Sequence, residues 1–340
     1  MWRRLEFAAS SRSYTISAGE SLKLNVIAEE MNVPIQKIYR TAYRKFGVGA
    51  FNVFNAEQVH GVFRGARRAA APVIVQLTPV ARDYLHPEML QGMIQAADKI
   101  YPGVIYTVHL DHGNYQHCAE AIDSGYYQSV MIDASHESFA DNIRITAEIV
   151  KKAHARGIAV EAELGVLSGV EDHLSTEEKS ARYTDPRLAA EFVKRTGCDS
   201  LAVAVGTSHG AYKFSGGDGL QLDILSEIRD KIPGFPLVLH GASAVPQDEV
   251  VRINQAGGTI REGARGTGEA ELLEAVRTGV CKINIATDMR LIWTRIHREF
   301  FRDTPEKFDL VVPGREYMNA LETFVAAKCT FLGSNNQKLS

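Results

Sequence analysis

The feature that most constrains this chain is a series of short apolar runs, rich in β-branched residues, that recur along most of its length. Apolar residues at helical spacing separate the runs, as between Phe139 and Val150, where Ser138 and Asp141 resemble a helix-capping box. Eight runs within about 240 residues predict an α/β fold, a closed (β/α)8 barrel of the TIM-barrel class. The runs are Val48–Val53, Val73–Thr78, Val104–His109, Ser129–Asp133, Ala159–Leu164, Ser200–Val205, Pro236–Leu239 and Cys281–Ile285.

The alternative architecture is a doubly wound open sheet, but no G-x-G-x-x-G follows the first run. We therefore expect one barrel domain over residues 23–335, preceded by a tail at 1–22. Leu5–Ser11 in that tail is too short and polar for a signal peptide. Two long connections, residues 165–186 and 254–268, are expected to be lid loops.

Charge and composition exclude several classes of protein. Lys plus Arg number 38 and Asp plus Glu 41, a formal charge of −3 that gives no footprint for nucleic acid. No apolar run approaches the roughly 18 residues of a membrane helix. The four cysteines include no C-x-x-C pair, which argues against a disulfide scaffold and favours the cytoplasm.

Polar residues gather where the predicted strands end, which in a barrel of this class is the edge that carries the active site. His112, His209 and His240 follow three different strands and can converge on one divalent ion with an open position, as in catalytic zinc sites. Each histidine alone is equally explained as a hydrogen-bonded rim residue. Carboxylates surround them: Asp111, Asp133 and Glu163.

Two glycine-containing turns, Gly206–Gly210 and His240–Ser243, place backbone N–H groups where an anion can bind, with Lys213 close behind. Glycine alone is explained as well by a tight turn. Both turns beside a metal site favour a phosphorylated substrate.

Five segments together resemble the class II, metal-dependent ketose-bisphosphate aldolases, and the resemblance extends from about Val48 to Gly333. It implies reversible cleavage of fructose or tagatose 1,6-bisphosphate to dihydroxyacetone phosphate and glyceraldehyde 3-phosphate through a zinc-stabilised enediolate. It also implies Zn²⁺ or a similar divalent ion, a monovalent cation as a second ion, and a homodimer or homotetramer. The segments are Gly49–Val53, Leu110–Gly113, Val130–Asp133, Val160–Gly165 and Gly206–Lys213.

The same resemblance implies roles for individual residues. His112, His209 and His240 are the expected metal ligands, with Asp133 and Glu163 holding the ion in an alternative inward position. Asp111 is the expected acid/base at the C4 hydroxyl and Glu171 the lid carboxylate that moves the C3 proton. Substrate and phosphate contacts are expected from Asn52, Thr78, Gly210, Lys213, Gly241, Ser243, Asn284, Thr287, Asp288 and Arg290.

Two departures from the family pattern leave the substrate open. Ala286 in the Asn284–Asp288 segment is typical of tagatose-bisphosphate aldolases, so either C4 epimer fits. Val311 stands where an arginine usually follows Asp309. Either Arg290 acts with Arg315, Arg261 or Arg265, or the distal end of the substrate is not a phosphate, which makes a ketose 1-phosphate a candidate.

Three other functions remain open at this point. Lys282 or Lys213 could support a Schiff-base aldolase, provided that its pKa is lowered by burial. A zinc site could instead activate water in a metallohydrolase. A catalytically inactive barrel that only binds a ligand is the third.

Overall fold

The computed structural model describes residues 31–166, 168–171, 174–176, 183–209, 219–263 and 266–339. The predicted tail at 1–22 lies outside the described residues, as do Gly210, Lys213 and Arg265.

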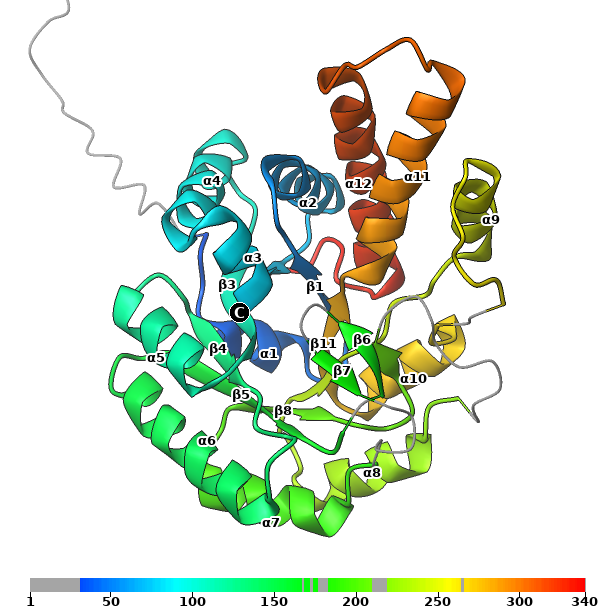
Figure 1. Cartoon of the computed structure of the whole chain (residues 1–340). Helices are drawn as coiled ribbons and strands as arrows, with labels where there is room; N and C mark the ends of the chain where they lie inside the picture. The colour runs from blue at the N-terminus through cyan, green and yellow to red at the C-terminus, as the bar shows by residue number, and fades with distance from the viewer. Residues whose placement is uncertain are drawn as a thin grey trace, which may run out of the picture. The chain divides into compact units, whose positions relative to one another are not determined.

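Eight parallel strands of the described chain close into a barrel in the order β1-β11-β10-β8-β5-β4-β3-β2, with helices around it (Figure 1). Closure runs from Val48 opposite Lys282 to Phe51 opposite Ile285, so the TIM barrel is confirmed and the open sheet is wrong. The strands are β1 (Val48–Asn52), β2 (Val73–Leu77), β3 (Tyr106–Gly113), β4 (Ser129–Ile132), β5 (Ala159–Leu164), β8 (Ser200–Val203), β10 (Leu237–Leu239) and β11 (Val280–Ile285).

The outer helices begin where the sequence supplies caps. The Ser138 hydroxyl accepts a hydrogen bond from the Asp141 N–H at 3.1 Å and starts α6, and the Asp185 carboxylate caps α7. These helices are α2 (Ala56–Ala69), α3 (Pro79–Leu85), α4 (Pro87–Ile100), α5 (Tyr115–Ser124), α6 (Phe139–His154), α7 (Pro186–Thr196), α8 (Leu222–Lys231), α9 (Gln247–Gln255), α10 (Glu269–Thr278), α11 (Thr287–Asp303) and α12 (Val311–Phe331).

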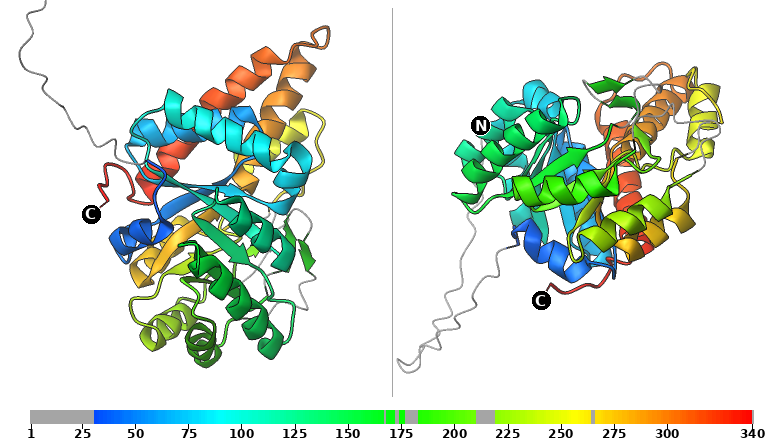
Figure 2. Two further views of the ribbon diagram at one scale, coloured as in Figure 1. Left: turned by 90° about the vertical axis from the view of Figure 1, so that its left-hand side faces the viewer. Right: turned by 90° about the horizontal axis from the view of Figure 1, so that it is seen from below.

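A further helix, α1 (Ile35–Ala42), covers the end of the barrel where the strands begin. Ile38 and Tyr39 pack there against Val48, Ile74 and other residues at the starts of the strands. Figure 2 shows α1 at one end of the barrel and the β6–β7 hairpin at the other. Because α1 fills one end with apolar side chains, the opposite end is left for polar chemistry.

The first predicted lid loop contains regular structure. Residues Ser168–Glu171 (β6) and Leu174–Thr176 (β7) form an antiparallel hairpin between β5 and α7. β6 also pairs in parallel with β9 (Ser208–His209), with Gly169 opposite His209. The second connection is shorter than expected, because α9 continues to Gln255 and α10 begins at Glu269.

Two further observations concern the apolarity of the helices and the state of the cysteines. Within the described part of the chain, no helix combines the length and the apolarity needed to cross a bilayer. All four cysteines are buried and free.

Helices α2 and α12 approach closely through glycine. A Cβ on Gly65 in α2 would lie 2.6 Å from the Val325 Cβ and 2.8 Å from the Glu322 carbonyl oxygen of α12. Both contacts involve atoms close to a helix backbone, so relief requires the helices to separate.

We therefore expect Gly65→Ala to lower the free energy of unfolding by about 1–3 kcal/mol through overpacking. Gly92→Ala is the matched control, because Gly92 is an exposed position inside α4 and has nothing within 4 Å of its Cβ position. That variant should gain about 0.5–1 kcal/mol from the lower backbone entropy of alanine. Denaturant titration checks both, and equal stabilities of the two variants would contradict close α2–α12 packing.

Candidate active site

Three side-chain amides from three strands hold the carboxylate of Asp111 at the carboxyl end of the barrel. Asn52 donates to Asp111 Oδ2 at 2.8 Å, Asn284 to Oδ1 at 3.1 Å, and Gln76 to Oδ2 at 3.4 Å. Gln76 also donates to the Asn52 carbonyl oxygen at 2.8 Å, which fixes the orientation of that amide. Asp111 is thus a fully buried hydrogen-bond acceptor in one orientation.

Asp111 and His112 are consecutive, yet both contact the barrel interior, which simple strand alternation forbids. The β3–β4 register shifts between Leu110 and Gly113, and His112 has a positive φ of 48°. Such a bulge re-aims the next side chain and is frequent beside active sites. The irregular backbone of β3 therefore brings a carboxylate and an imidazole into the same space.

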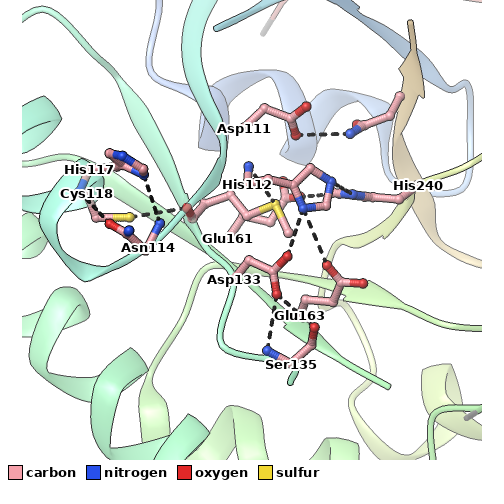
Figure 3. Close-up of polar contacts among 12 residues, drawn as sticks. Asp111, His112, Asn114, His117, Cys118, Asp133, Ser135, Glu161, Glu163 and His240 are labelled. Carbon is pink, nitrogen blue, oxygen red and sulfur yellow. Dashed lines mark hydrogen bonds and ion pairs between the residues drawn. The ribbon is translucent and has the colours of Figure 1, made fainter. Parts of the chain in front are cut away.

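His112 joins two groups of polar side chains (Figure 3). Its Nε2 lies 2.8 Å from Nδ1 of His240, which directly follows β10. Its Nδ1 lies 2.9 Å from Oδ2 of Asp133, after β4, and 3.9 Å from Oε2 of Glu163 in β5. Four strand ends therefore meet at His112, as the sequence predicts for this edge.

The electrostatics of this cluster displace the carboxylates in opposite directions. Burial opposes ionisation of Asp133, but hydrogen bonds from His112 and Ser135 outweigh it and hold the pKa of Asp133 well below its usual value. Burial and the neighbouring Asp133 raise the pKa of Glu163 well above its usual value. Burial alone would lower the pKa of His112, yet Asp111, Asp133 and Glu163 raise it far above normal.

The residues present fit a divalent metal ion. Ligand atoms of Asp111, His112 and His240 lie within 4.8 Å of one another, as do those of His112, Asp133 and Glu163. Among the described residues, Glu163 Oε2 is buried with no hydrogen-bond partner, which a bound cation would correct. Imidazole and carboxylate donors together suit zinc and similar divalent ions.

Several predicted site residues have other contacts. The Thr78 hydroxyl caps α3 by accepting from the Ala81 N–H at 3.2 Å. Asp288 accepts from the Ala244 and Val245 N–H groups and so shapes the turn that carries Gly241 and Ser243. Thr287 begins α11, and the exposed Arg290 guanidinium lies 5.1 Å from the centre of the Phe54 ring.

For four other predicted residues, the structure describes only the backbone or nothing at all. The backbones of Glu171 and His209 end β6 and β9, while Gly210 and Lys213 lie outside the described residues. The three-histidine site and the lid carboxylate therefore stay predictions.

Sequence reasoning missed two members of the site network and one connection. Gln76 and Glu161 are polar residues inside otherwise apolar strands, and both point into the barrel to bond site residues. Lys282 bonds Glu161 at 2.9 Å. Polar side chains inside buried strands were the available signal, because such groups must find partners within the barrel.

Comparisons with known proteins agree with this geometry. Residues 33–337 match the family described as Fructose-bisphosphate aldolase class-II. The fructose-bisphosphate aldolase of Giardia intestinalis is 44% identical over 278 residues, covering 80% of this chain and 84% of that protein. The fructose-bisphosphate aldolase of Thermus caldophilus is 42% identical over 293 residues, covering 85% of this chain and 93% of that protein. A solved aldolase structure from Coccidioides immitis superposes with a TM-score of 0.73 at 27% identity. The superposition covers 90% of this chain and 97% of that chain.

The fold and the site define a (β/α)8 barrel with buried carboxylates and imidazoles at the carboxyl end of its strands. The chain belongs to the class II fructose-bisphosphate aldolase family, whose members are aldehyde-lyases.

We expect this site to bind one divalent ion, and we expect that a chelator abolishes cleavage while Zn²⁺ restores it. Metal-free protein should gain about 2.7 kcal/mol of stability when free Zn²⁺ reaches 100 times its dissociation constant. His112→Ala should lose this stabilisation. His154→Ala is the control, since His154 lies on α6 and pairs with Asp199. Thermal unfolding with and without Zn²⁺ measures the effect, and an equal gain in His112→Ala would contradict the site.

Proposed function

We propose that the enzyme reversibly cleaves a ketose 1,6-bisphosphate, fructose or its C4 epimer tagatose, to dihydroxyacetone phosphate and glyceraldehyde 3-phosphate. The observation that carries this proposal is the position of Asp111: a buried carboxylate, fixed by three amides, directly beside the His112 and His240 imidazoles. Family membership and the sugar phosphates named for the relatives support the substrate class.

Cleavage of the C3–C4 bond requires a base at the C4 hydroxyl and stabilisation of the charge left beside the ketone. Asp111 is the base in this proposal, because its amide partners aim it without neutralising it. His112 and His240, with His209, would hold a zinc ion, which when bound supplies Lewis-acid stabilisation of negative charge at the ketone oxygen. Glu171, on the lid hairpin, returns the proton to C3.

A Schiff-base mechanism is disfavoured by the surroundings of Lys282. Its side chain is fully buried, and its Nζ donates to Glu161 at 2.9 Å. A lysine that attacks a carbonyl must be neutral and reach the substrate. Lys282 is instead fully buried and hydrogen-bonded to a carboxylate, so borohydride should trap no adduct at this residue.

The distal end of the substrate has a candidate location beside Arg290. A cavity of about 530 Å³ opens between the start of α2, α3 and α11, and its lining includes Phe54, Tyr84, Arg290 and Trp293. Among the described lining residues, one cation lies with three aromatic rings, and it offers a phosphate fewer charge-assisted bonds than two arginines would. Val311, 61% exposed at the start of α12, cannot supply the missing pair. A ketose 1-phosphate with another distal group is accordingly the second candidate substrate.

The two proposed carboxylates act on different protons, which gives a test that separates them. Dihydroxyacetone phosphate has no C4, so exchange of its C3 proton with solvent needs Glu171 but not Asp111. We expect Glu171→Gln to abolish this exchange, and Asp111→Asn to retain it while losing about 10²–10⁴-fold in kcat for cleavage.

Proton exchange followed by NMR and a coupled cleavage assay measure these two steps, with metal content determined for each variant. Loss of both activities together with loss of metal would contradict a role for that residue in proton transfer. Wild-type exchange in Glu171→Gln would exclude it as the C3 base.

The role of Arg290 is tested by comparing kcat/KM for fructose 1,6-bisphosphate and fructose 1-phosphate. Losing a charge-assisted bond costs about 1.5–3 kcal/mol, so Arg290→Ala should lose roughly 10- to 150-fold on the bisphosphate only. Arg298→Ala is the control, because Arg298 lies on the same helix and donates to the Gly257 carbonyl. Equal losses on both substrates would show that Arg290 does not bind the distal phosphate.

The cytoplasmic location, the single domain over residues 23–335 and the homo-oligomer also stay proposals. The four buried, free cysteines support a reducing compartment. Size-exclusion chromatography with light scattering measures the oligomer.

A further inference from the structure

Beneath the proposed metal site, a second group of charged and polar side chains fills the barrel interior. Glu161, Lys282, His109 and His240 come from four different strand segments, and all four side chains are fully buried. Glu161 lies at the centre of this group and has no part in the chemistry proposed above. A buried carboxylate costs free energy unless its partners compensate it, so the contacts of Glu161 indicate its role.

One oxygen of Glu161 has two partners. Oε1 lies 2.9 Å from Lys282 Nζ and 2.9 Å from His240 Nε2. The other oxygen, Oε2, lies 3.6 Å from His109 Nε2 and has no hydrogen-bond partner among the described residues. His109 is held separately, through a 2.9 Å contact between its Nδ1 and the Ser129 hydroxyl.

These contacts determine the orientation and tautomer of His240. Lys282 is a donor only, so it requires Oε1 of Glu161 as an acceptor. The same oxygen then accepts from His240, which places the ring proton on Nε2 and the lone pair on Nδ1. Nδ1 is the atom that faces His112 Nε2 at 2.8 Å. The imidazole therefore presents its lone pair to the place where an ion would bind.

We propose that Glu161 is a positioning residue for His240, and that Lys282 compensates its buried charge. Carboxylates that accept the second N–H of a metal-bound histidine fix the ring and raise its basicity, and losing one typically lowers metal affinity about 10- to 100-fold. Stability alone does not explain the pair, because apolar residues of similar volume are usually at least as stabilising as a buried ion pair. The inference rests on the proposed function, since it requires a metal at His240.

The test removes the pair as a unit. In Glu161→Leu/Lys282→Met no uncompensated charge remains, so the metal-free protein should fold with an unfolding temperature close to that of the wild type. His240 loses its Nε2 partner, and we expect Zn²⁺ affinity, measured by competition with a chromophoric chelator, to fall about 10- to 100-fold. Ser129→Ala is the control, because it removes a hydroxyl from His109 and leaves the His240 contact intact. Its Zn²⁺ affinity should match the wild type.

Glu161→Asp provides a second measurement should the double variant not fold. It keeps the charge and withdraws the carboxylate by one methylene. A positioning role therefore predicts weaker Zn²⁺ binding, whereas a role in charge alone predicts Zn²⁺ affinity equal to that of the wild type. Wild-type Zn²⁺ affinity in either folded variant, or an equal loss in Ser129→Ala, would overturn the inference while the proposed function stands. A wild-type protein that binds no divalent ion would overturn both.

Discussion

The hydrogen bonds between β1 and β11 are the constraint on which the site depends. They join strands more than 200 residues apart in the chain, with Ala50 opposite Asn284, and they close the barrel. Closure places Asn52 and Asn284 on the two oxygens of one carboxylate, that of Asp111. In an open sheet these strands would be at opposite edges and the carboxylate would lose the amide of Asn284. The geometry around Asp111 is therefore a property of the closed barrel rather than of any local motif.

The polar interior is stable because nearly every charge in it has a specific partner. Asp133 is held by His112 and Ser135, and Glu161 by Lys282 and His240. Glu161 and Glu163 each have one oxygen with no hydrogen bond among the described residues, and burial together with Asp133 raises the pKa of Glu163. A buried carboxylate left incompletely bonded costs stability in the free protein. The Glu163 oxygen lies 3.9 Å from His112 Nδ1, where a bound cation would give it a partner.

Most of the barrel could be predicted from the sequence, because buried parallel strands give continuous apolar runs that local composition reveals. The run at Ala159–Leu164 matches β5 at both ends, and Ser138 and Asp185 mark helix starts through their caps. His112, Asp133 and His240 lie together at these strand ends, while the three-histidine site stays a prediction.

What the sequence could not supply was long-range or irregular. Helix α1 has an apolar face that is explained only by the barrel end it covers, and the bulge that turns both Asp111 and His112 inward depends on pairing with β4. The partners of Glu161 come from strands distant in sequence. The hairpin β6–β7 lies in a polar segment with no apolar alternation to reveal it.

The pairing of β6 with β9 has a consequence for any movement of the predicted lid. Gly169 is opposite His209, so the segment that ends in Glu171 and the segment that ends in a predicted ligand share one edge of hydrogen bonds. Two segments joined in this way cannot shift independently without breaking those bonds. If His209 turns toward an ion, the hairpin is biased by the same free energy, and linkage requires the reverse as well. Ion occupancy and lid position would then behave as one cooperative variable, so that each state of the lid has its own affinity for the ion.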